Sequence, residues 1–120
     1  MGHVDLGAEG ERAALEALRA RGLVLVGQRV RLRLGEIDLV LMDGPVVVFA
    51  EVKTRSGAGF GRPAEAVTRA KRRRLERLAA AYLARRGWGE RRCRFDVVEV
   101  EPVAGALVAR HIVDAFRAGD

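Results

Sequence analysis

The sequence predicts an α/β fold in which helices flank a mixed sheet. Segments with helical periodicity alternate with segments of strand character, in the order helix, three strands, helix, strand. Residues 46–55 carry apolar side chains on both strand faces, which is typical of a strand in the middle of a sheet that is covered on both sides. With 120 residues, the chain suits a single domain that spans residues 1–120.

The composition is that of a globular protein with a basic surface. Apolar residues make up 49% and charged residues 32% of the chain, and the formal net charge of +6 favours a polyanionic partner. No window approaches about 18 uninterrupted apolar residues, and the N-terminus lacks the apolar segment of a signal peptide, so we expect a cytoplasmic protein without membrane contact. The one cysteine, Cys93, has no partner for an intrachain disulfide, and we expect it to be a small buried strand residue.

Residues 8–20 predict an amphipathic helix that ends at Gly22. Its apolar stripe contains Ala14, Leu15 and Leu18, and Glu11 lies on the same inward face. Glu11 is therefore either a first-turn carboxylate that complements the helix dipole or an acid that points into a functional site.

Residues 23–34 predict a strand with a bulge at Gly27. Arg29, Arg31 and Arg33 alternate with apolar residues, so one face of this strand is basic. Such a row of arginines is either solvated surface or a track for phosphates.

Residues 35–55 predict a β-hairpin, because two apolar runs flank a turn signal. With a two-residue loop at Gly44 and Pro45, the antiparallel register places Asp38 opposite Glu51. Opposed side chains have Cβ atoms about 5 Å apart, and two carboxylates that close repel each other. A cation between them removes this conflict, so we expect a metal ion at these two acids.

Two more charged side chains accompany the acid pair. Lys53 lies two residues after Glu51 on the same face, about 6.6 Å along the strand. Lys53 and Lys71 are the only lysines among 22 Lys and Arg residues, and lysine, unlike arginine, is a compact donor whose pKa can be tuned. Glu36 shares the face of Asp38 and is either an outer acid of the site or a solvated strand start.

Residues 63–86 predict a long helix that follows a glycine-rich loop. Lys71 lies on its apolar stripe, between Val67 and Leu75. Glu65, in the first turn, either faces the site or complements the helix dipole. A separate face is basic and is either solvated or in contact with phosphates, which the net charge favours. It consists of Arg69, Arg72, Arg73 and Arg77.

Two strands complete the chain. Residues 94–101 alternate apolar and polar residues as a strand that Pro102 stops, and residues 106–113 predict a final edge strand. Trp88, in the loop before them, either stacks on a base or fixes the loop to the core. His111 has no matching metal-ligand partner in the sequence, so a histidine-based mechanism lacks support.

The acids and Lys53 together indicate metal-assisted phosphodiester hydrolysis. Asp38 and Glu51 supply hard oxygen ligands, which Mg²⁺ or Mn²⁺ takes together with water and phosphate oxygens, and the Val52 carbonyl is a further ligand in this interpretation. Such an ion activates a water molecule and polarises the phosphodiester. Lys53 then either stabilises the charge of the transition state or positions the attacking water.

These residues resemble known nuclease sequences. The order of the elements, with Asp38 and then Glu51-Val52-Lys53 on successive strands, resembles the PD-(D/E)XK nuclease core of archaeal Holliday junction resolvases and restriction endonucleases. Ile37 is a departure, because the nuclease superfamily often has Pro before the first acid. A larger set resembles the YraN family, also called UPF0102, over nearly the whole chain. This set is Gly10-Glu11, Gly35-Glu36-Ile37-Asp38-Leu39, Phe49, Glu51-Val52-Lys53-Thr54-Arg55, Phe60-Gly61, Glu65-Ala66-Val67, Lys71, Tyr82-Leu83 and Arg94-Phe95-Asp96-Val97-Val98.

The resemblance implies a restriction-endonuclease-like core and a resolvase-like acidic site, in which Glu11 joins Asp38, Glu51 and Val52 around the metal ion and Lys53 assists hydrolysis. We therefore expect a metal-dependent endonuclease that acts on DNA, with branched or damaged DNA as the expected substrate. Because junction-cleaving relatives are dimers, the resemblance also implies that this chain forms a homodimer. The side chains expected to contact DNA are Arg55, Arg69, Lys71, Arg72, Arg73 and Arg77.

Two alternatives remain open at this point. One is a non-catalytic nucleic-acid-binding protein that retains the nuclease fold. The other is a subunit whose partner supplies specificity and whose basic face is a protein interface. An enzyme shows metal-dependent turnover, whereas the non-catalytic binding protein does not. Both bind nucleic acid at moderate salt, whereas the subunit with a protein interface does not bind it strongly.

Overall fold

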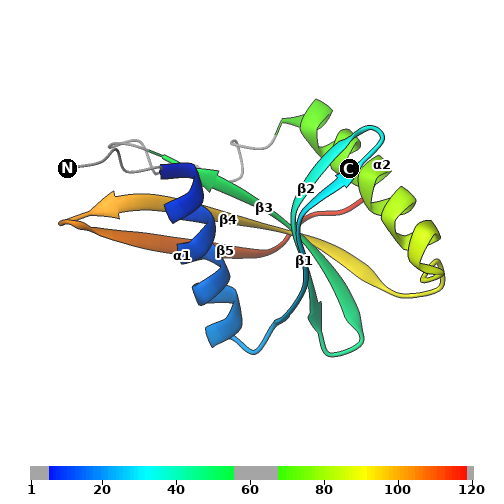
Figure 1. Cartoon of the computed structure of the whole chain (residues 1–120), viewed down its shortest axis with the longest axis horizontal. Coiled ribbons are helices and arrows are strands. Elements are labelled where there is room, and N and C mark those ends of the chain that lie inside the picture. Colours follow the sequence, from blue (N-terminus) through cyan, green and yellow to red (C-terminus); the bar gives the residue numbers. More distant parts are fainter. Residues whose placement is uncertain (1–5, 56–67, 119–120) are drawn as a thin grey trace.

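The computed structural model describes residues 6–55 and 68–118 of the chain. Within these ranges it contains two helices and five strands (Figure 1). In chain order the elements are α1 (Leu6–Ala20), β1 (Val24–Leu32), β2 (Gly35–Asp43), β3 (Val46–Thr54), α2 (Arg69–Arg86), β4 (Cys93–Val103) and β5 (Ala106–Phe116). No helix in the described ranges is long and apolar enough to cross a membrane.

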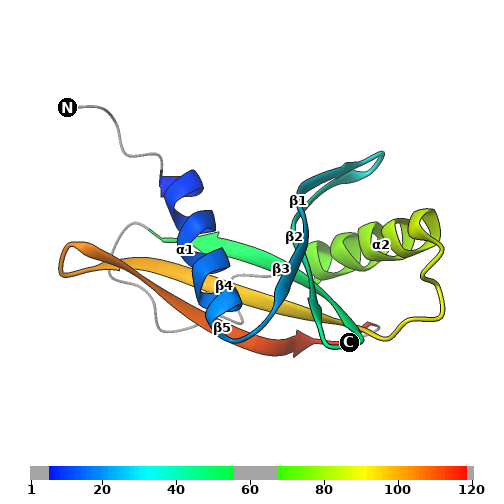
Figure 2. The same ribbon diagram turned by 60° about the horizontal axis from the view of Figure 1, so that its bottom comes forward.

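The strands form one mixed sheet in the order β1-β2-β3-β4-β5. β3 and β4 are parallel, since the connection through α2 returns the chain to the same end of the sheet, and the other neighbouring pairs are antiparallel. The helices α1 and α2 pack on opposite faces (Figures 1 and 2). This arrangement confirms the predicted α/β fold with a mixed sheet flanked by helices, and it is consistent with a restriction-endonuclease-like core. β5 lies at an edge of the sheet, as predicted.

The apolar stripe of α1 packs on one face of the sheet, against buried residues of β2, β3 and β4. Glu11 is buried on this inward face, as predicted. The helix ends where the Leu23 N–H donates to the Leu18 carbonyl oxygen at 3.2 Å, and Gly22 takes the left-handed φ of 91° that this turn requires. The buried side chains of the stripe are Ala14, Leu15 and Leu18.

The helix α2 covers the other face through an aromatic core. The Tyr82 ring meets the Phe49 ring of β3 edge-on, with 5.8 Å between the ring centroids, and Phe49 stacks on Phe95 of β4 at 5.9 Å. The helix ends at Gly87, whose left-handed φ of 68° closes the last turn. These contacts fix the side of α2 that faces the sheet, and therefore also the side that faces outward.

The helix α2 begins later than predicted. It starts at Arg69, and the Thr68 side-chain oxygen caps it by accepting a hydrogen bond of 3.2 Å from the Lys71 N–H. Thr68 itself has an extended backbone with ψ of 164°, so a single unbroken helix from residue 63 is wrong. Residues 63–67, and with them Glu65, lie outside the described residues.

The β2–β3 hairpin has the predicted register. Asp43 pairs with Val46, and the ladder continues in register as far as Leu39 and Ala50. β1 also contains a bulge next to Gly27, where its register with β2 shifts, as predicted. The turn residues and the alternation of apolar and polar residues therefore predict that β2 pairs with β1 and with β3.

Three details of the strands differ from the prediction. β1 ends at Leu32, and Arg33 and Leu34 form a tight turn, so Arg33 does not continue the basic face of the strand. β4 continues through Pro102, because a proline near the end of a strand interrupts little of the ladder. Cys93 is exposed rather than buried, since it is the first residue of β4 and lies at the end of the sheet.

Candidate active site

β2 and β3 part at the two predicted acids. Their pairing ends at Leu39 and Ala50, and the next residues are Asp38 and Glu51. The Val52 N–H donates a hydrogen bond of 2.8 Å to Asp38 Oδ2, and the carboxyl groups of Asp38 and Glu51 are close enough to shift each other's pKa. The two acids are therefore neighbours at the point where the strands part, next to the last pair of the predicted register.

Burial and mutual repulsion make this acid pair hard to ionise. Burial is the main cause that raises the pKa of both carboxyl groups. The negative charge of Asp38 adds to this effect, and the pKa of Glu51 reaches about 7 even though Lys71 and Lys53 act to lower it. Near neutral pH a proton on Glu51 would therefore compete with a bound cation.

Both lysines of the chain lie beside the acids. Lys53 follows Glu51 on β3, Lys71 comes from the first turn of α2, and their side chains are hydrogen-bonded to each other. This hydrogen bond is the main cause that lowers the pKa of Lys53, followed by burial and the positive charge of Lys71. The structure thus brings Lys71 to the acid pair rather than to the basic face of α2.

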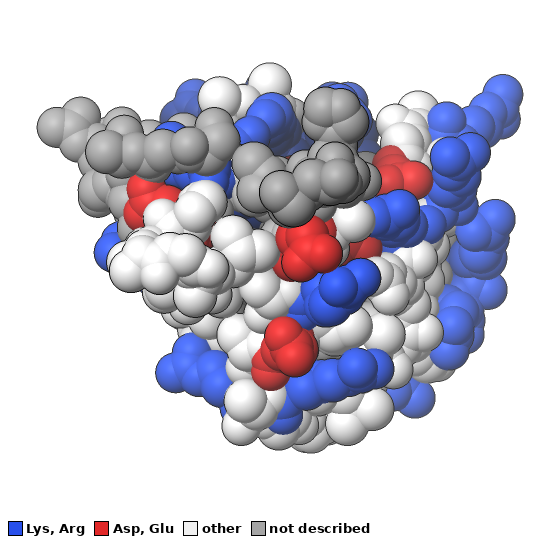
Figure 3. Space-filling model, turned by 60° about the vertical axis from the view of Figure 1, so that its left-hand side comes forward, with Lys and Arg blue, Asp and Glu red and all other residues white. Residues whose placement is uncertain are grey.

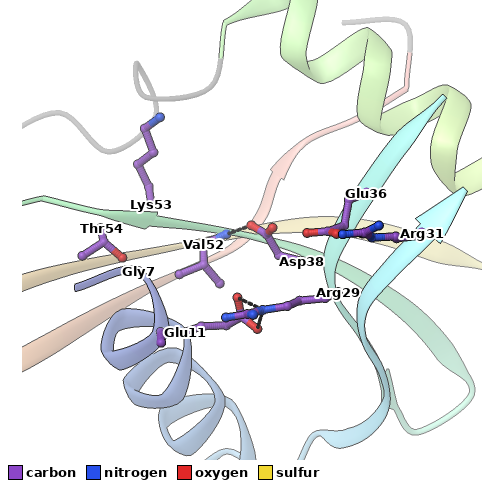
Figure 4. A pocket seen from close by; sticks show the side chains of 10 residues that line it. Gly7, Glu11, Arg29, Arg31, Glu36, Asp38, Val52, Lys53 and Thr54 are labelled. Carbon is purple, nitrogen blue, oxygen red and sulfur yellow. Dashed lines mark hydrogen bonds and ion pairs between the residues drawn. The ribbon is translucent and has the colours of Figure 1, made fainter. Parts of the chain in front are cut away.

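A pocket of about 550 Å³ opens where the strands part. Figure 4 shows Asp38, Val52 and Lys53 lining it from the sheet and Glu11 lining it from α1. In this view Lys53 and Glu11 point to opposite sides of β3. The other lining residues are Gly7, Ala8, Arg29, Arg31, Glu36 and Thr54.

Glu11 reaches this pocket with partners of its own. Its carboxylate accepts a hydrogen bond of 2.8 Å from Gln28 Nε2 and bonds of 3.2 and 3.3 Å from Arg29 Nε. Its charge still contributes to the raised pKa of Asp38. Among the described residues, no group of three or more His, Cys, Asp or Glu side chains is arranged to hold a metal ion. The role of Glu11 as a third metal ligand stays a prediction.

A smaller pocket of about 70 Å³ lies on the α2 side of the acids. Glu51 and Glu36 line it from the sheet, and Lys71 and Arg74 line it from α2. Glu36 also forms an exposed ion pair of 3.4 Å with Arg31. Arg74 was not predicted to lie at the site, although its position three residues after Lys71 places both side chains on the same side of the helix.

Three of the arginines predicted to contact DNA are exposed on α2. Arg69, Arg73 and Arg77 follow one another at intervals of four residues, so they lie along one face of the helix. Figure 3 shows that basic side chains gather along one edge of the molecule, whereas acidic side chains are dispersed over the face in view. These three residues therefore form the part of the predicted basic face of α2 that is exposed.

Two other predicted arginines have partners within the chain. The Arg72 guanidinium lies 5.3 Å from the centroid of the Phe116 ring. Arg55 Nε lies 2.9 Å from an oxygen of Glu99, a fully buried carboxylate on β4. These partners turn Arg72 and Arg55 away from the row formed by the exposed arginines, and their contact with DNA stays a prediction.

Similarity to known proteins assigns the chain to a family. The model of the Uncharacterised protein family UPF0102 matches residues 10–100. The chain belongs to the UPF0102 family. A UPF0102 protein of Symbiobacterium thermophilum is 56% identical over 114 residues, which cover 94% of this chain and 97% of the relative. A UPF0102 protein of Nocardia farcinica is 45% identical over 113 residues (94% and 87%), and one of Chlorobaculum tepidum is 42% identical over 121 residues (96% and 94%).

The UPF0102 match confirms the resemblance to this family. It extends from α1 into β4 and so includes all the acids and lysines of the candidate site. The description of the family as uncharacterised names no reaction. The chemistry of a UPF0102 protein must therefore be argued from the geometry of its site.

This UPF0102 chain also buries a polar cluster that its sequence did not reveal. Asp96 is fully buried on β4 and lies 2.7 Å from His111 Nε2 of β5, and it accepts hydrogen bonds from Arg94 Nε at 3.0 Å and from the Asp114 N–H at 2.8 Å. Arg94 also contacts Asp43 at 2.6 Å. His111 is thus a partner of a buried carboxylate. This role agrees with its lack of a matching metal-ligand partner in the sequence.

Proposed function

We propose that this UPF0102 protein is a Mg²⁺-dependent endonuclease, also active with Mn²⁺, that hydrolyses phosphodiester bonds of DNA. The observation that carries the proposal is the adjacent pair of partly buried carboxyl groups of Asp38 and Glu51, whose pKa values are both raised, with Lys53 beside them. Buried acids with raised pKa values cost folding free energy when they ionise, so a cationic ligand accounts for their proximity. Phosphodiester hydrolysis is the reaction that this combination of groups suits best.

The donor set fits Mg²⁺. This ion typically binds through one or two carboxylates and keeps water and substrate phosphate oxygens as its other ligands. Asp38 and Glu51 would supply the carboxylates, and the Val52 carbonyl would supply a further oxygen. When bound, the ion polarises the phosphate and lowers the pKa of a bound water. Glu11 would join as a ligand only after its carboxylate exchanges Arg29 for the ion.

Lys53 and Lys71 supply positive charge beside the acids. The phosphate gains negative charge on the way to the transition state, and preorganised donors near it lower the barrier. A lowered pKa makes Lys53 the easier of the two amines to deprotonate, so Lys53 is suited to positioning the attacking water. Lys71, which also interacts with Glu51, would add a second amino group beside the phosphate.

The exposed arginines of α2 are placed to hold the DNA backbone. Arg69, Arg73 and Arg77 lie on the same helix as Lys71 and Arg74, whose side chains line the pocket at the acids. Arginine binds phosphate oxygens through two parallel hydrogen bonds and stays charged at all relevant pH values. A DNA strand that follows α2 would therefore bring a phosphodiester to the acid pair.

A cleavage assay with matched acid variants tests the proposal. Wild-type protein should nick plasmid DNA or cut branched DNA in Mg²⁺ or Mn²⁺, and EDTA should abolish the activity. Glu51→Gln and Asp38→Asn should lower the rate by about 100-fold or more, because even outer partners of a metal ligand cost 10–100-fold. Glu16→Gln, which changes an exposed acid of α1, is the control and should cut like wild type. Equal cleavage by Glu51→Gln would indicate a contaminant or another site.

A non-catalytic nucleic-acid-binding protein that retains the nuclease fold is the second candidate. The observation that favours it is the ion pair of Glu11 with Arg29, because it engages one of the three acids predicted to hold the metal ion. It predicts DNA binding that weakens log-linearly with salt and no metal-dependent turnover on several substrates. If no nucleic acid binds at moderate salt, the basic face is instead a protein interface.

A further inference from the structure

The turn between β1 and β2 carries an exposed leucine. Leu32 pairs with Gly35, so the turn consists of Arg33 and Leu34, which we call the β1–β2 tip. Leu34 is 61% exposed. Two-residue hairpin turns favour Gly, Asn and Asp for their backbone freedom, and an exposed leucine contributes little to folding by the hydrophobic effect. Neither the turn nor the core therefore accounts for a leucine at this position.

Basic side chains surround the tip. The Arg31 side chain is 89% exposed, and Arg33 is exposed as well. Arg74 of α2 lies along the base of the tip, with its Nε 3.5 Å from the position that a β-carbon on Gly35 would take. The ion pair of Arg31 with Glu36 is exposed, so its exchange for a phosphate costs little. An apolar side chain among cations matches a ligand with anionic flanks and an apolar interior, which is stacked DNA.

The tip is held close to the acid pair. β1 and β2 are paired along the length of β1, and Figure 2 shows the closed end of their hairpin projecting from the sheet beside α2. Four residues separate Leu34 from Asp38, which is about 13 Å along a strand. Because stacked nucleotides repeat at about 3.4 Å, this distance corresponds to about four base steps. A strand bound at the acids would thus pass within reach of Leu34.

We propose that Leu34 is a wedge that inserts between bases of the bound DNA, while Arg31, Arg33 and Arg74 hold the flanking phosphates. This inference rests on the proposed function, because it takes DNA as the ligand of the acid site. Leucine and similar apolar side chains unstack base steps and kink the duplex in this way. Unstacking costs least where pairing is already interrupted. The preferred substrate is therefore DNA with a branch or a mismatch rather than a continuous duplex.

A fluorescent base at a DNA branch tests the wedge. 2-Aminopurine brightens when it unstacks, and EDTA prevents cleavage during the measurement. Saturating wild-type protein should raise the fluorescence of 2-aminopurine placed at the branch. Leu34→Ser should lose most of this rise, whereas Leu34→Met should keep it because the apolar wedge is preserved. The matched control is Val24→Ser, at the other end of β1, where Val24 is 63% exposed; this variant should keep the full rise.

DNA binding and DNA cleavage are measured separately, so that each outcome either supports or overturns one of the two proposals. All four proteins should bind a continuous duplex equally in fluorescence anisotropy, since phosphate contacts supply that affinity. A full rise with Leu34→Ser, or an equal loss with Val24→Ser, overturns the wedge. If Glu51→Gln cuts DNA like wild type while the Leu34 effect persists, the proposed active site fails and the wedge stands. If wild-type protein binds no DNA, both proposals fall.

Discussion

Glu51 is the residue whose environment says most about the chemistry of the site. It is partly buried beside Asp38, and its pKa is raised to about 7. Burial of two adjacent acids is unfavourable unless a proton or a cation compensates for their charge. The negative charge of Asp38 adds to the effect of burial, and Lys53 and Lys71 lie alongside. The same groups that raise the cost of folding are those that we propose as ligands of a divalent ion.

Glu51→Gln should stabilise the metal-free protein at pH 8 by about 1–3 kcal/mol. An ordinary Glu has a pKa near 4.5, and the folded protein raises that of Glu51 to about 7. At pH 8 the folded state must therefore keep Glu51 ionised against its environment, at a cost of about 1.4 kcal/mol per pKa unit. Glutamine has nearly the same shape and no charge, so it avoids this cost. Urea unfolding at pH 8 in EDTA measures the difference.

The control for this prediction is Glu16→Gln on α1, which should change the free energy of unfolding by less than about 0.5 kcal/mol. Added Mg²⁺ should stabilise wild type and not Glu51→Gln, because an ion that binds only the folded state shifts the unfolding equilibrium. A Glu51→Gln protein that is less stable than wild type in EDTA would contradict a raised pKa at this position.

At the scale of elements, the sequence predicted the parts of the site that depend on local rules. The two-residue loop at Gly44 and Pro45 determines the β2–β3 register, and helical periodicity identified the inward face of α1. Contacts between elements distant in sequence were not predictable in this way. Arg29 meets Glu11 only because a bulge precedes it and its φ is +50°, and Arg74 reaches the acids only through the packing of α2.

β4 illustrates the same limit. Its alternation of apolar and polar residues is typical of a half-exposed strand, yet Asp96, Glu99 and Glu101 are all buried. The reason is that β4 lies between β3 and β5 and is covered on its faces by other elements. The partners of Asp96 and Glu99 come from β5, from β4 itself and from Arg55 after β3, and they explain how these two acidic side chains can be buried.

Asp96→Asn should destabilise the protein by about 2–4 kcal/mol at pH 7, because it weakens a buried, hydrogen-bonded ion pair. Burial alone would raise the pKa of Asp96, but hydrogen bonds from His111, Arg94 and the Asp114 N–H outweigh it and lower the pKa below the ordinary 3.8. Ionised Asp96 therefore stabilises the fold above pH 3.8, and this contribution is lost as the pH falls through the lower pKa of the folded state.

Urea unfolding at pH 7 and at pH 3 measures this effect. The stability difference between wild type and Asp96→Asn should be largest at pH 7 and should shrink at pH 3, where protonation weakens the cluster in wild type. Asp114→Asn is the control, because the cluster uses the backbone N–H of Asp114 and not its side chain. A difference of the same size at both pH values would show that the charge of Asp96 is unimportant and that only its shape matters.

On the scale of the whole molecule, the parting of β2 from β3 connects the two faces of the sheet at one point. Glu11 and Arg29 approach the acids from the α1 side, and Lys71 and Arg74 approach from the α2 side. α2, with 18 residues, is about 27 Å long, which corresponds to about eight base pairs of a DNA duplex. A helix of this length, with arginines on its outer face, can follow a DNA strand while its inner face contributes to the acid site.

This geometry predicts that the charge dependence of DNA binding resides on α2. Arg77→Ala should reduce the slope of log K against log salt by about 0.9, the change expected when one phosphate contact is lost. Arg69→Ala and Arg73→Ala should do the same, since their side chains lie on the same helix face. The measurement is fluorescence anisotropy with a DNA duplex in EDTA over a series of salt concentrations.

Arg19→Ala is the matched control for these variants. Arg19 is an exposed arginine in the last turn of α1, on the opposite face of the sheet, and its loss changes the net charge by the same amount. If DNA follows α2, Arg19→Ala leaves the slope unchanged while Arg77→Ala lowers it. If both variants lower the slope equally, the attraction comes from the net charge alone, and α2 does not guide DNA to the acids.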